Sequence, residues 1–264
     1  MRIVSLNAWG GAMFGQLGPW LSAADADVIC LQEVTRTPGV SGWTRFEDGE
    51  RSLPQRANLF QDIRALRPND QAVMLASDAG PVTDQSGIRH RQEFGIATFV
   101  TEHAPVTGLQ TAFVHGEFVD HEDWAIEDRP RAALATRIVD RSQGRSVAVI
   151  QLHGLRDPAG KHDTPARMRQ AERLAALVER ASSSADLTVV CGDLNLLPTS
   201  QTFAVLAELG LTDLVGAADT RTSAYPKPTR HASYLLISDP SAVKSFTIVA
   251  SPEVSDHRPL LLDL

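Results

Sequence analysis

The sequence predicts an α+β protein in which two packed sheets, mainly antiparallel or mixed, carry helices on their outer sides. Short apolar runs rich in β-branched residues recur along all 264 residues. Stretches with helical spacing lie between them, but strands and helices do not alternate regularly. Short turn-like segments separate several runs, as between 94–100 and 104–114, and this favours antiparallel pairing of neighbours.

The predicted strands share an apolar, largely β-branched composition. In chain order they are 3–6, 28–31, 71–75, 94–100, 109–114, 132–139, 147–152, 187–191, 233–238, 243–249 and 259–264.

The clearest predicted helix covers 165–181. Thr164 is a suitable N-cap, Pro165 fits the first turn, and apolar residues recur on one face. A second helix is expected over 200–209, where Gly210 can end it. The remaining helical stretches are 15–24 and 57–66.

Composition indicates one globular domain spanning 1–264. The hydrophobic fraction of 43% is enough for a substantial core, and no linker, repeat or low-complexity run divides the chain. Polar residues of interest occur near both ends of the sequence. We therefore expect the two ends of the domain to meet in space.

Charge and cysteine usage restrict the partners and the location. Lys and Arg number 25 against 32 Asp and Glu, a net charge of −7, and no basic block is present. Tight binding to long duplex DNA is therefore not favoured. Cys30 and Cys191 lie in apolar runs and are expected to be buried and reduced. No apolar stretch approaches the roughly 20 residues of a membrane span, so a cytoplasmic protein without a membrane partner is expected.

Chemically capable side chains follow or precede several predicted strands. Asn7 follows 3–6, Glu33 follows 28–31, Asp193 and Asn195 follow 187–191, and Asp256 precedes the last run. Strand ends can hold carboxylates rigidly at a cleft. A buried carboxylate needs a cation or hydrogen-bond donors, and a metal ion is the simplest partner for Glu33.

Each of these signals is weak alone. Glu33 by itself reads as a surface residue at a strand end, and Gly192 to Asn195 could form an ordinary turn. His153, after 147–152, would more often be structural than catalytic, and the same holds for the pair of Asp256 and His257. Their combination and order are much more specific than any one member.

Taken together, these blocks resemble the endonuclease/exonuclease/phosphatase superfamily, which has the deoxyribonuclease I-like fold. The resemblance spans the whole chain, and the segments that carry it are Asn7, Leu31 to Glu33, Phe94 to Val100, Arg129 to Leu134, His153, Gly192 to Asn195 and Ser255 to His257. It implies a four-layer α/β/β/α sandwich with the site at the strand ends. It also implies hydrolysis of phosphoester bonds with Mg²⁺, or with Mn²⁺ or Ca²⁺ in its place.

The resemblance also implies roles for individual residues. Glu33 would be the main metal ligand, with Asn7 and Asp256 in or near the coordination shell. Asp193 would orient or deprotonate the attacking water, and Asn195 would hold a phosphate oxygen. The residues that would donate to the phosphoryl group are His153 and His257. This division of tasks suits in-line hydrolysis, which needs charge on the phosphoryl oxygens to be neutralised.

One position departs from the family pattern. The family carries an aspartate that steadies the final histidine, and Ser233 stands there in the segment from Arg230 to Tyr234. A hydroxyl can hydrogen-bond an imidazole but brings no charge, so His257 should be less readily protonated. The chain is expected to be an active phosphoesterase, and the alternative is a degenerate module that binds phosphate without catalysis.

Two long segments bear on the substrate. His115 to Trp124 concentrates metal-capable side chains and could form a second metal site, although an acidic loop that repels polyanions is the simpler interpretation. The irregular stretch 36–56 holds Trp43 and Phe46, which could stack on a ring or only pack. These features favour a small or single-stranded phosphoester.

A DNA endonuclease or exonuclease is the other enzymatic possibility. It would gain support from a basic concave face lined by Arg89, Arg91, Arg129, Arg167 or Arg169. Oligomeric state does not follow from the sequence.

Overall fold

The computed structural model describes residues 1–49, 51–125, 129–157 and 160–264. Its four α-helices are α1 (Phe14–Ala23), α2 (Leu59–Leu66), α3 (Pro165–Ser182) and α4 (Gln201–Glu208), and two 3₁₀ turns are η1 (Trp9–Gly11) and η2 (Pro240–Ala242); these counts and those of the strands refer to the described ranges. The strands are β1 (Arg2–Asn7), β2 (Val28–Arg36), β3 (Trp43–Glu47), β4 (Ser52–Arg56), β5 (Gln71–Asp84), β6 (Arg89–Val100), β7 (Val106–His115), β8 (Val119–Asp120), β9 (Arg131–Asp140), β10 (Arg145–His153), β11 (Leu187–Asp193), β12 (Thr212–Asp213), β13 (Ser233–Ile237), β14 (Ser245–Ile248) and β15 (Leu260–Asp263).

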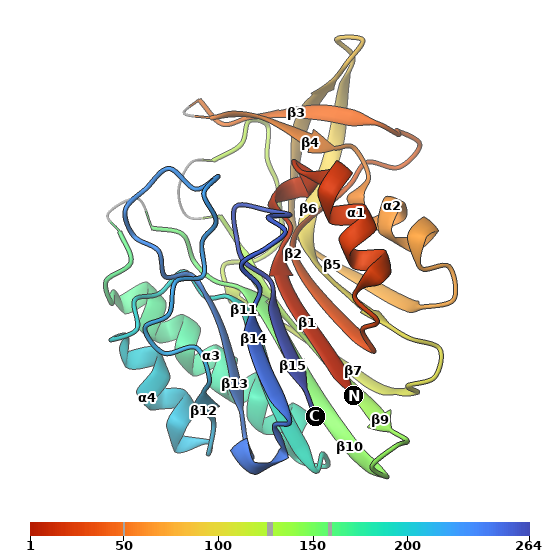
Figure 1. Ribbon diagram of the computed structural model, residues 1–264. Coiled ribbons are helices and arrows are strands. Elements are labelled where there is room, and N and C mark those ends of the chain that lie inside the picture. The colour runs from red at the N-terminus through yellow and green to blue at the C-terminus, as the bar shows by residue number, and fades with distance from the viewer. Residues whose placement is uncertain (50, 126–128, 158–159) are drawn as a thin grey trace.

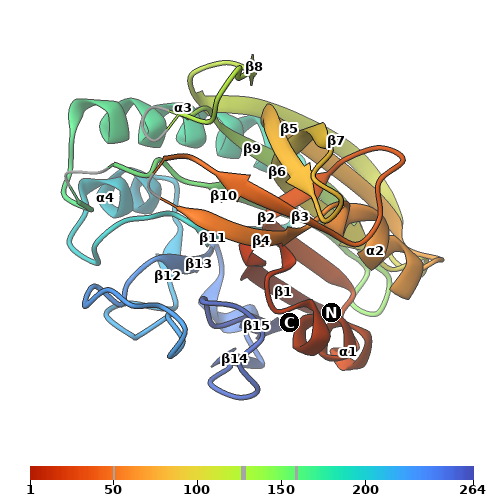
Figure 2. The same ribbon diagram turned by 90° about the horizontal axis from the view of Figure 1, so that it is seen from above.

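Two sheets pack face to face and helices cover their outer faces. The first sheet has the order β14-β15-β1-β2-β6-β5-β3-β4, with β8 added beside β5, and the second has the order β12-β13-β11-β10-β9-β7. Figures 1 and 2 show α1 and α2 outside the first sheet and α3 and α4 outside the second. The α+β class and the four-layer α/β/β/α sandwich expected from the sequence are therefore confirmed.

Alternation along the strands builds the layers. In β2, Val28 and Cys30 face the core between the sheets, whereas Ile29 and Leu31 pack under α1 and α2. A strand that is apolar on both faces suits a position in the middle of a covered sheet. Cys30 and Cys191 are both free and buried, as expected from the apolar runs that contain them.

Two strand predictions were wrong. The runs 94–100 and 104–114 do not pair with each other, because β6 pairs with β2 and β5 while β7 pairs with β9 in the other sheet. The short segment between them carries the chain across the sandwich instead of forming a hairpin turn. The stretch 36–56 is not wholly irregular, since about half of it forms the antiparallel strands β3 and β4 at the edge of the first sheet.

Three of the four α-helices in the described ranges, α2, α3 and α4, begin at polar caps. The side chain of Thr164 accepts a hydrogen bond from the backbone of Arg167, and Asn58 caps α2 in the same way, so that this helix begins at Leu59. Among the described residues, every helix is too short or too polar to span a membrane.

Strand pairing places the first and the last strand of the chain side by side. β1 lies between β15, which is antiparallel to it, and β2, which is parallel to it. In the second sheet β10 and β11 are also parallel. Because the carboxyl ends of parallel strands meet at the same edge of a sheet, both sheets present chemically capable residues at the end that lies uppermost in Figure 1.

A buried amide pair ties the sheets together beneath this edge. Gln32 of β2 donates to the side chain of Gln151 of β10 at 3.0 Å, and Gln151 donates to the carbonyl of Ala97 at 2.7 Å. These polar side chains are fully buried, so their geometry is costly to disturb. Gln32 directly precedes Glu33, and Gln151 lies two residues before His153. The hydrogen bond between them therefore fixes the distance between β2 and β10 close to these two site residues.

Candidate active site

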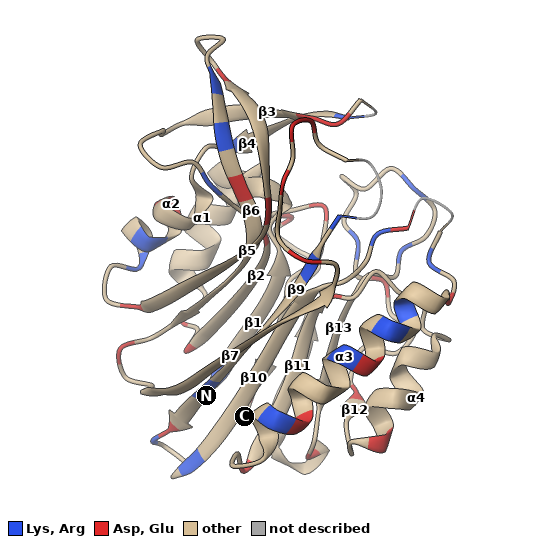
Figure 3. Cartoon of the chain, turned by 180° about the vertical axis from the view of Figure 1, so that it is seen from behind, with Lys and Arg blue, Asp and Glu red and all other residues tan. Residues whose placement is uncertain are grey.

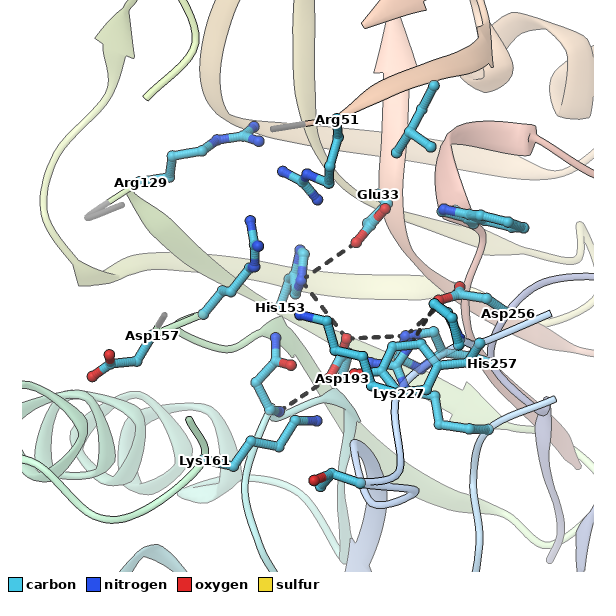
Figure 4. A pocket seen from close by; sticks show the side chains of 18 of the residues that line it. Glu33, Arg51, Arg129, His153, Asp157, Lys161, Asp193, Lys227, Asp256 and His257 are labelled. Atoms are coloured by element: carbon cyan, nitrogen blue, oxygen red, sulfur yellow. Dashed lines mark hydrogen bonds and ion pairs between the residues drawn. The ribbon is translucent and has the colours of Figure 1, made fainter. Parts of the chain in front are cut away.

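The predicted residues meet at the common edge of the sheets. His153 ends β10 directly opposite Asp193, which ends β11, and Asp193 is in turn opposite Ser233 at the start of β13. The strands approach very closely here, since a Cβ on Gly192 would lie 2.1 Å from the carbonyl oxygen of Leu152. Figure 4 shows Glu33, His153, Asp193, Asp256 and His257 converging on one cavity.

Glu33 lies inside a strand and not at its end. β2 continues to Arg36, and its register against β6 shifts between Gln32 and Val34. This bulge gives Glu33 a φ of 56°, in the left-handed region that residues other than glycine rarely adopt. The bulge turns the carboxylate into the cavity, where its side chain is 23% exposed.

Asp193 is the centre of the hydrogen-bond network. Its Oδ2 accepts from Asn7 Nδ2 at 3.0 Å and lies 3.3 Å from His257 Nε2 and 3.8 Å from His153 Nε2. Asn7 also donates to Glu33 at 3.1 Å, so one amide links two carboxylates. The side chain of Asp193 is almost fully buried, and the arrangement holds one face of it toward the cavity.

The charge state of Asp193 follows from its neighbours. Burial by itself raises its pKa, but electrostatic interactions with His153, Arg221 and Lys161, together with the hydrogen bond from Asn7, outweigh burial and lower the pKa below its ordinary value. Asp193 is therefore an ionised acceptor near neutral pH, as a group that orients or deprotonates water must be.

Both histidines are held in the neutral form. Burial lowers the pKa of His257 well below its usual range, and the charges of Arg221 and Lys161 add to this effect. Burial, together with the charge of Arg131, lowers the pKa of His153 in the same direction. The pKa of His257 is thus shifted in the direction expected from its missing aspartate, but the main physical cause is burial.

Ser233 occupies the position expected to support His257. Its hydroxyl lies 2.9 Å from His257 Nδ1, and both side chains are buried. A neutral imidazole that donates through Nε2 toward Asp193 must accept at Nδ1, and a hydroxyl can supply that proton. Ser233 and Asp193 therefore fit one tautomer of His257.

Asn195 reaches the same cavity through a tight turn. Its backbone N–H donates to Asp193 Oδ1 at 3.0 Å, and its φ is 55°, a conformation that asparagine tolerates better than most residues. The side-chain amide donates to the carbonyl of Gly154 at 3.3 Å and borders the cavity. The second amide proton can reach an oxygen of a bound ligand.

Asp256 borders the cavity where a metal ion could bind, and it also forms an ion pair with an arginine side chain. Its Oδ2 accepts from Arg221 at 2.7 Å. Burial raises the pKa of Asp256 to about 7, Arg221 opposes this, and the negative charges of Glu33 and Asp193 raise it further. Glu33, Asp193 and Asp256 thus lie close enough together for their charges to interact.

These residues fit a divalent cation. The oxygens of Glu33 face the cavity beside Asp193 and Asp256, and Mg²⁺ prefers a few such ligands together with water. Within the described ranges, no group of three or more His, Cys, Asp and Glu is arranged to hold an ion by itself. Water and substrate oxygens would have to complete the shell around Glu33.

The second metal site considered for 115–124 is not formed. His121 contacts Asp78 at 3.2 Å, and Asp120 pairs with Arg91. Figure 3 shows that acidic residues concentrate along the segment around β8, at the side of β5. Most of the segment is exposed, whereas Trp124 is buried and β8 pairs with β5.

The cavity has a volume of about 640 Å³ and is lined by more than the predicted residues. Several basic and aromatic side chains that sequence reasoning did not assign border it, and they are Trp9, Arg51, Arg131, Lys161, Arg221, Tyr225 and Lys227. Arg131 lies within the recognised segment from Arg129 to Leu134 but was given no role there, and the loop residues carry no sequence signal of their own. Of the five arginines considered for a basic face, Arg129 and Arg167 line the cavity.

Fold and site together define a protein of the phosphoesterase class. The chain belongs to the endonuclease/exonuclease/phosphatase family, whose sequence pattern matches residues 4–257. The family resemblance of the sequence motifs is thereby confirmed, and phosphoester hydrolysis is the general kind of chemistry that goes with it.

Solved structures share the fold over nearly their full length. The catalytic domain of human nocturnin with bound sulfate is 17% identical, with a TM-score of 0.65 and coverage of 100% of this chain and 93% of that one. The mannosyl-6-phosphatase of Bacteroides thetaiotaomicron is 14% identical, with a TM-score of 0.67 and coverage of 100% and 98%. D. rerio TDP2 complexed with a single-strand DNA product is 14% identical, with a TM-score of 0.65 and coverage of 99% and 97%. A search of curated proteins gives no match.

Proposed function

We propose that the protein is a metal-dependent phosphoesterase that hydrolyses a small or single-stranded phosphoester by in-line attack of water. The observation that carries this proposal is the contact of Asp193 with two neutral histidines and Asn7, beside Glu33, at the wall of a basic cavity. A carboxylate acceptor and nearby N–H donors are the groups that such a hydrolysis needs.

Each residue has a task in the proposed reaction. Asp193 orients the attacking water and accepts its proton, while His153 and His257, whose Nε2 atoms lie beside Asp193, share their Nε2 protons between this carboxylate and the phosphoryl oxygens of a bound ligand. Asn195 holds a further oxygen through its amide. A bound Mg²⁺, with Mn²⁺ or Ca²⁺ as alternatives, would be held by Glu33 with Asn7 or Asp256 nearby and would neutralise charge on the phosphoryl group.

The dimensions of the cavity favour a small substrate. A volume of about 640 Å³ is typical of sites for small molecules. Two of the relatives by fold are named for a sugar phosphatase activity and a complex with single-strand DNA, which is consistent with a phosphomonoester or a single strand. A nuclease remains the alternative substrate class, and cytoplasmic location remains a prediction.

Hydrolysis of bis(p-nitrophenyl) phosphate tests the proposal. Turnover should require Mg²⁺ or Mn²⁺, stop with EDTA, and be lost in Glu33→Ala and Asp193→Asn. Glu117→Ala, an exposed glutamate outside the cavity, serves as the matched control and should keep full activity. Single- and double-stranded DNA under the same conditions would separate a nuclease from a small-ester hydrolase.

One observation favours a second candidate function. Ser233 supplies no charge to His257, so the site could bind a phosphorylated ligand without turning it over. Folded protein that binds phosphate and metal but hydrolyses none of these substrates would replace the hydrolase by this binding module.

A further inference from the structure

The side chains that line the cavity carry a net positive charge, whereas the whole chain carries a net negative charge. Of the residues that line it, eight are Lys or Arg and four are Asp or Glu, whereas the whole chain has 25 basic and 32 acidic residues. A cleft with the sign opposite to that of its protein concentrates ligands of the matching charge. The ligand should therefore carry more negative charge than one phosphodiester.

Several of the basic side chains are already neutralised by carboxylates. Arg129 is paired with Asp78 at 2.6 Å, and Arg51 is paired with Asp48. Arg221 forms an ion pair with Asp256. These cations shape the wall but have little positive charge left for a ligand.

Arg131, unlike these three arginines, lies near Glu33 and Asp193, where the scissile phosphoryl group is proposed to bind. It is 4% exposed, its Nε has no hydrogen-bond partner among the described residues, and it borders the cavity. Burial lowers its pKa to about 10, with a further decrease from Arg129, while Asp78, Glu33 and Asp193 raise it. Its charge is therefore placed for the phosphoryl group that is hydrolysed.

Lys161 supplies a second positive region on another side of the site. Its Nζ donates to the carbonyl of His231 at 2.6 Å, and no carboxylate among the described residues forms an ion pair with it. Figure 4 shows Lys161 and Lys227 on one side of Asp193, with Arg51 and Arg129 on the other side of the group formed by Glu33 and His153.

Arg167 contributes a second, buried positive charge near Lys161. Arg167 is 1% exposed, and among the described residues its guanidinium donates to the backbone carbonyls of His162, Leu155 and Gly160. Burial lowers the pKa of Lys161 to about 8; Asp193 raises it, whereas the charges of Arg221 and Arg167 lower it further. Within the part of the chain that the structure describes, neither cation forms an ion pair with a carboxylate, and both line the cavity, an arrangement that a bound anion would stabilise.

We propose that the substrate carries a second phosphate group, apart from the ester that is hydrolysed, and that Lys161 binds this second phosphate. This inference rests on the proposed function, because it assigns the substrate class of the same site. The scissile phosphoryl group lies against Glu33, Asp193 and Arg131, and the second phosphate lies against Lys161, with exposed Lys227 at the mouth. The substrate class is a small organic bisphosphate.

Binding measurements test the second phosphate without requiring turnover. Isothermal titration calorimetry with Mg²⁺ would compare thymidine 5′-monophosphate with thymidine 3′,5′-bisphosphate, and inorganic phosphate with pyrophosphate. At least one doubly phosphorylated ligand should bind about tenfold more tightly than its partner, the effect of one charge-assisted hydrogen bond. Equal affinities within both pairs would overturn the proposal.

Substitutions of Lys161 test whether this residue binds the second phosphate. Lys161→Met should reduce the affinity for the doubly phosphorylated ligand to that of the single phosphate, and Lys161→Arg should keep the difference. Lys244→Met is the matched control, since Lys244 also donates to a backbone carbonyl, that of Leu264, on the edge strand remote from the site. A preference that survives in Lys161→Met, or in Lys161→Gln should the first variant not fold, contradicts the assignment.

The two proposals can fail separately. Wild-type protein that hydrolyses bis(p-nitrophenyl) phosphate but binds single and double phosphates equally keeps the proposed function and loses this inference. Wild-type protein that prefers double phosphates through Lys161 but hydrolyses no ester keeps this inference and loses the proposed function.

Discussion

His257 shows how a single residue sets the chemistry of the site. Its Nε2 points to Asp193 and its Nδ1 to the hydroxyl of Ser233, so both ring nitrogens are satisfied in the neutral form. An aspartate at position 233 would instead require a proton on Nδ1 and would favour the charged ring. Ser233 therefore favours the neutral form of His257 that carries its proton on Nε2.

Replacement of Ser233 tests this role. Ser233→Asp should raise kcat, because the added carboxylate strengthens His257 as a donor to the phosphoryl group. Ser233→Ala should lower kcat by about tenfold, since Nδ1 would be buried without a partner. Initial rates with bis(p-nitrophenyl) phosphate give the comparison.

The matched control is Ser22→Ala, which removes a hydroxyl bonded to a helix carbonyl in α1. It should leave kcat unchanged. If Ser233→Asp gave no increase while the protein stayed folded, Ser233 would have no part in positioning His257.

Most residues of the candidate site could be predicted from the sequence, but several of the side chains that surround them could not. Asn7, Glu33, His153 and Asp193 follow apolar runs. A parallel register aligns such residues within each sheet, and the face-to-face packing of the two sheets then brings Asn7 against Asp193. Lys161 belongs to a loop, and its place beside Asp193 depends on the path of the chain before α3. No local pattern in the sequence encodes that path.

At the scale of the element, β2 contains the main departure from regular structure. A strand with the composition of Val28 to Leu31 should continue smoothly, yet a bulge interrupts it at Glu33. Non-glycine residues in the left-handed region store strain, and such strain is often found at functional sites. The bulge therefore places the carboxylate in the cavity at a cost in stability.

Comparison of two substitutions at Glu33 measures that cost. Glu33→Gly should be more stable to urea than Glu33→Ala by about 1 kcal/mol, because only glycine relieves the positive φ. Both variants lack the carboxylate, so both should be inactive. Equal stabilities of the two variants would show that the bulge carries no strain.

The same scale explains which elements were hard to predict. β5 extends to Asp84, well beyond the apolar run 71–75, because its distal half pairs with β6 in a long hairpin. The polar composition of that half gives no strand signal. Likewise β7 has the pattern of a strand, but its partner β9 is set by the crossing between sheets and not by sequence distance.

At the scale of the whole molecule, one buried ion pair connects the sheets outside the hydrophobic core. Asp78 belongs to β5 of the first sheet, and Arg129 lies two residues before β9 of the second. Asp78 is fully buried, and the Arg129 guanidinium also stacks on Phe94 and Trp124 at 4.6 Å and 4.7 Å. Removing one partner would leave a buried charge without compensation.

The ion pair makes stability depend on pH. Burial alone raises the pKa of Asp78, but the charge of Arg129 and hydrogen bonds from His121 and Arg129 lower it well below its usual range. A folded-state pKa below that of the unfolded chain contributes stability at pH above about 4, which is lost as the pH falls through the folded-state pKa.

Asp78→Asn should lower the free energy of unfolding at pH 7 by about 3 kcal/mol and should flatten its decline on acidification. Urea titrations from pH 7 to pH 3 provide the measurement. Asp123→Asn removes an exposed pair with Arg89 and should change little. A parallel acid decline in wild type and Asp78→Asn would contradict the role of this pair.

The hydrogen bond from Ser255 Oγ to the carbonyl of Asn7, at 2.7 Å, joins positions 248 residues apart in the chain. During translation, Asn7 leaves the ribosome long before Asp256 and His257 are made. A nascent chain can therefore assemble Glu33, His153 and Asp193 without the histidine that completes the network around Asp193. The proposed activity would begin only when β15 docks beside β1, so synthesis itself keeps partly made chains inactive.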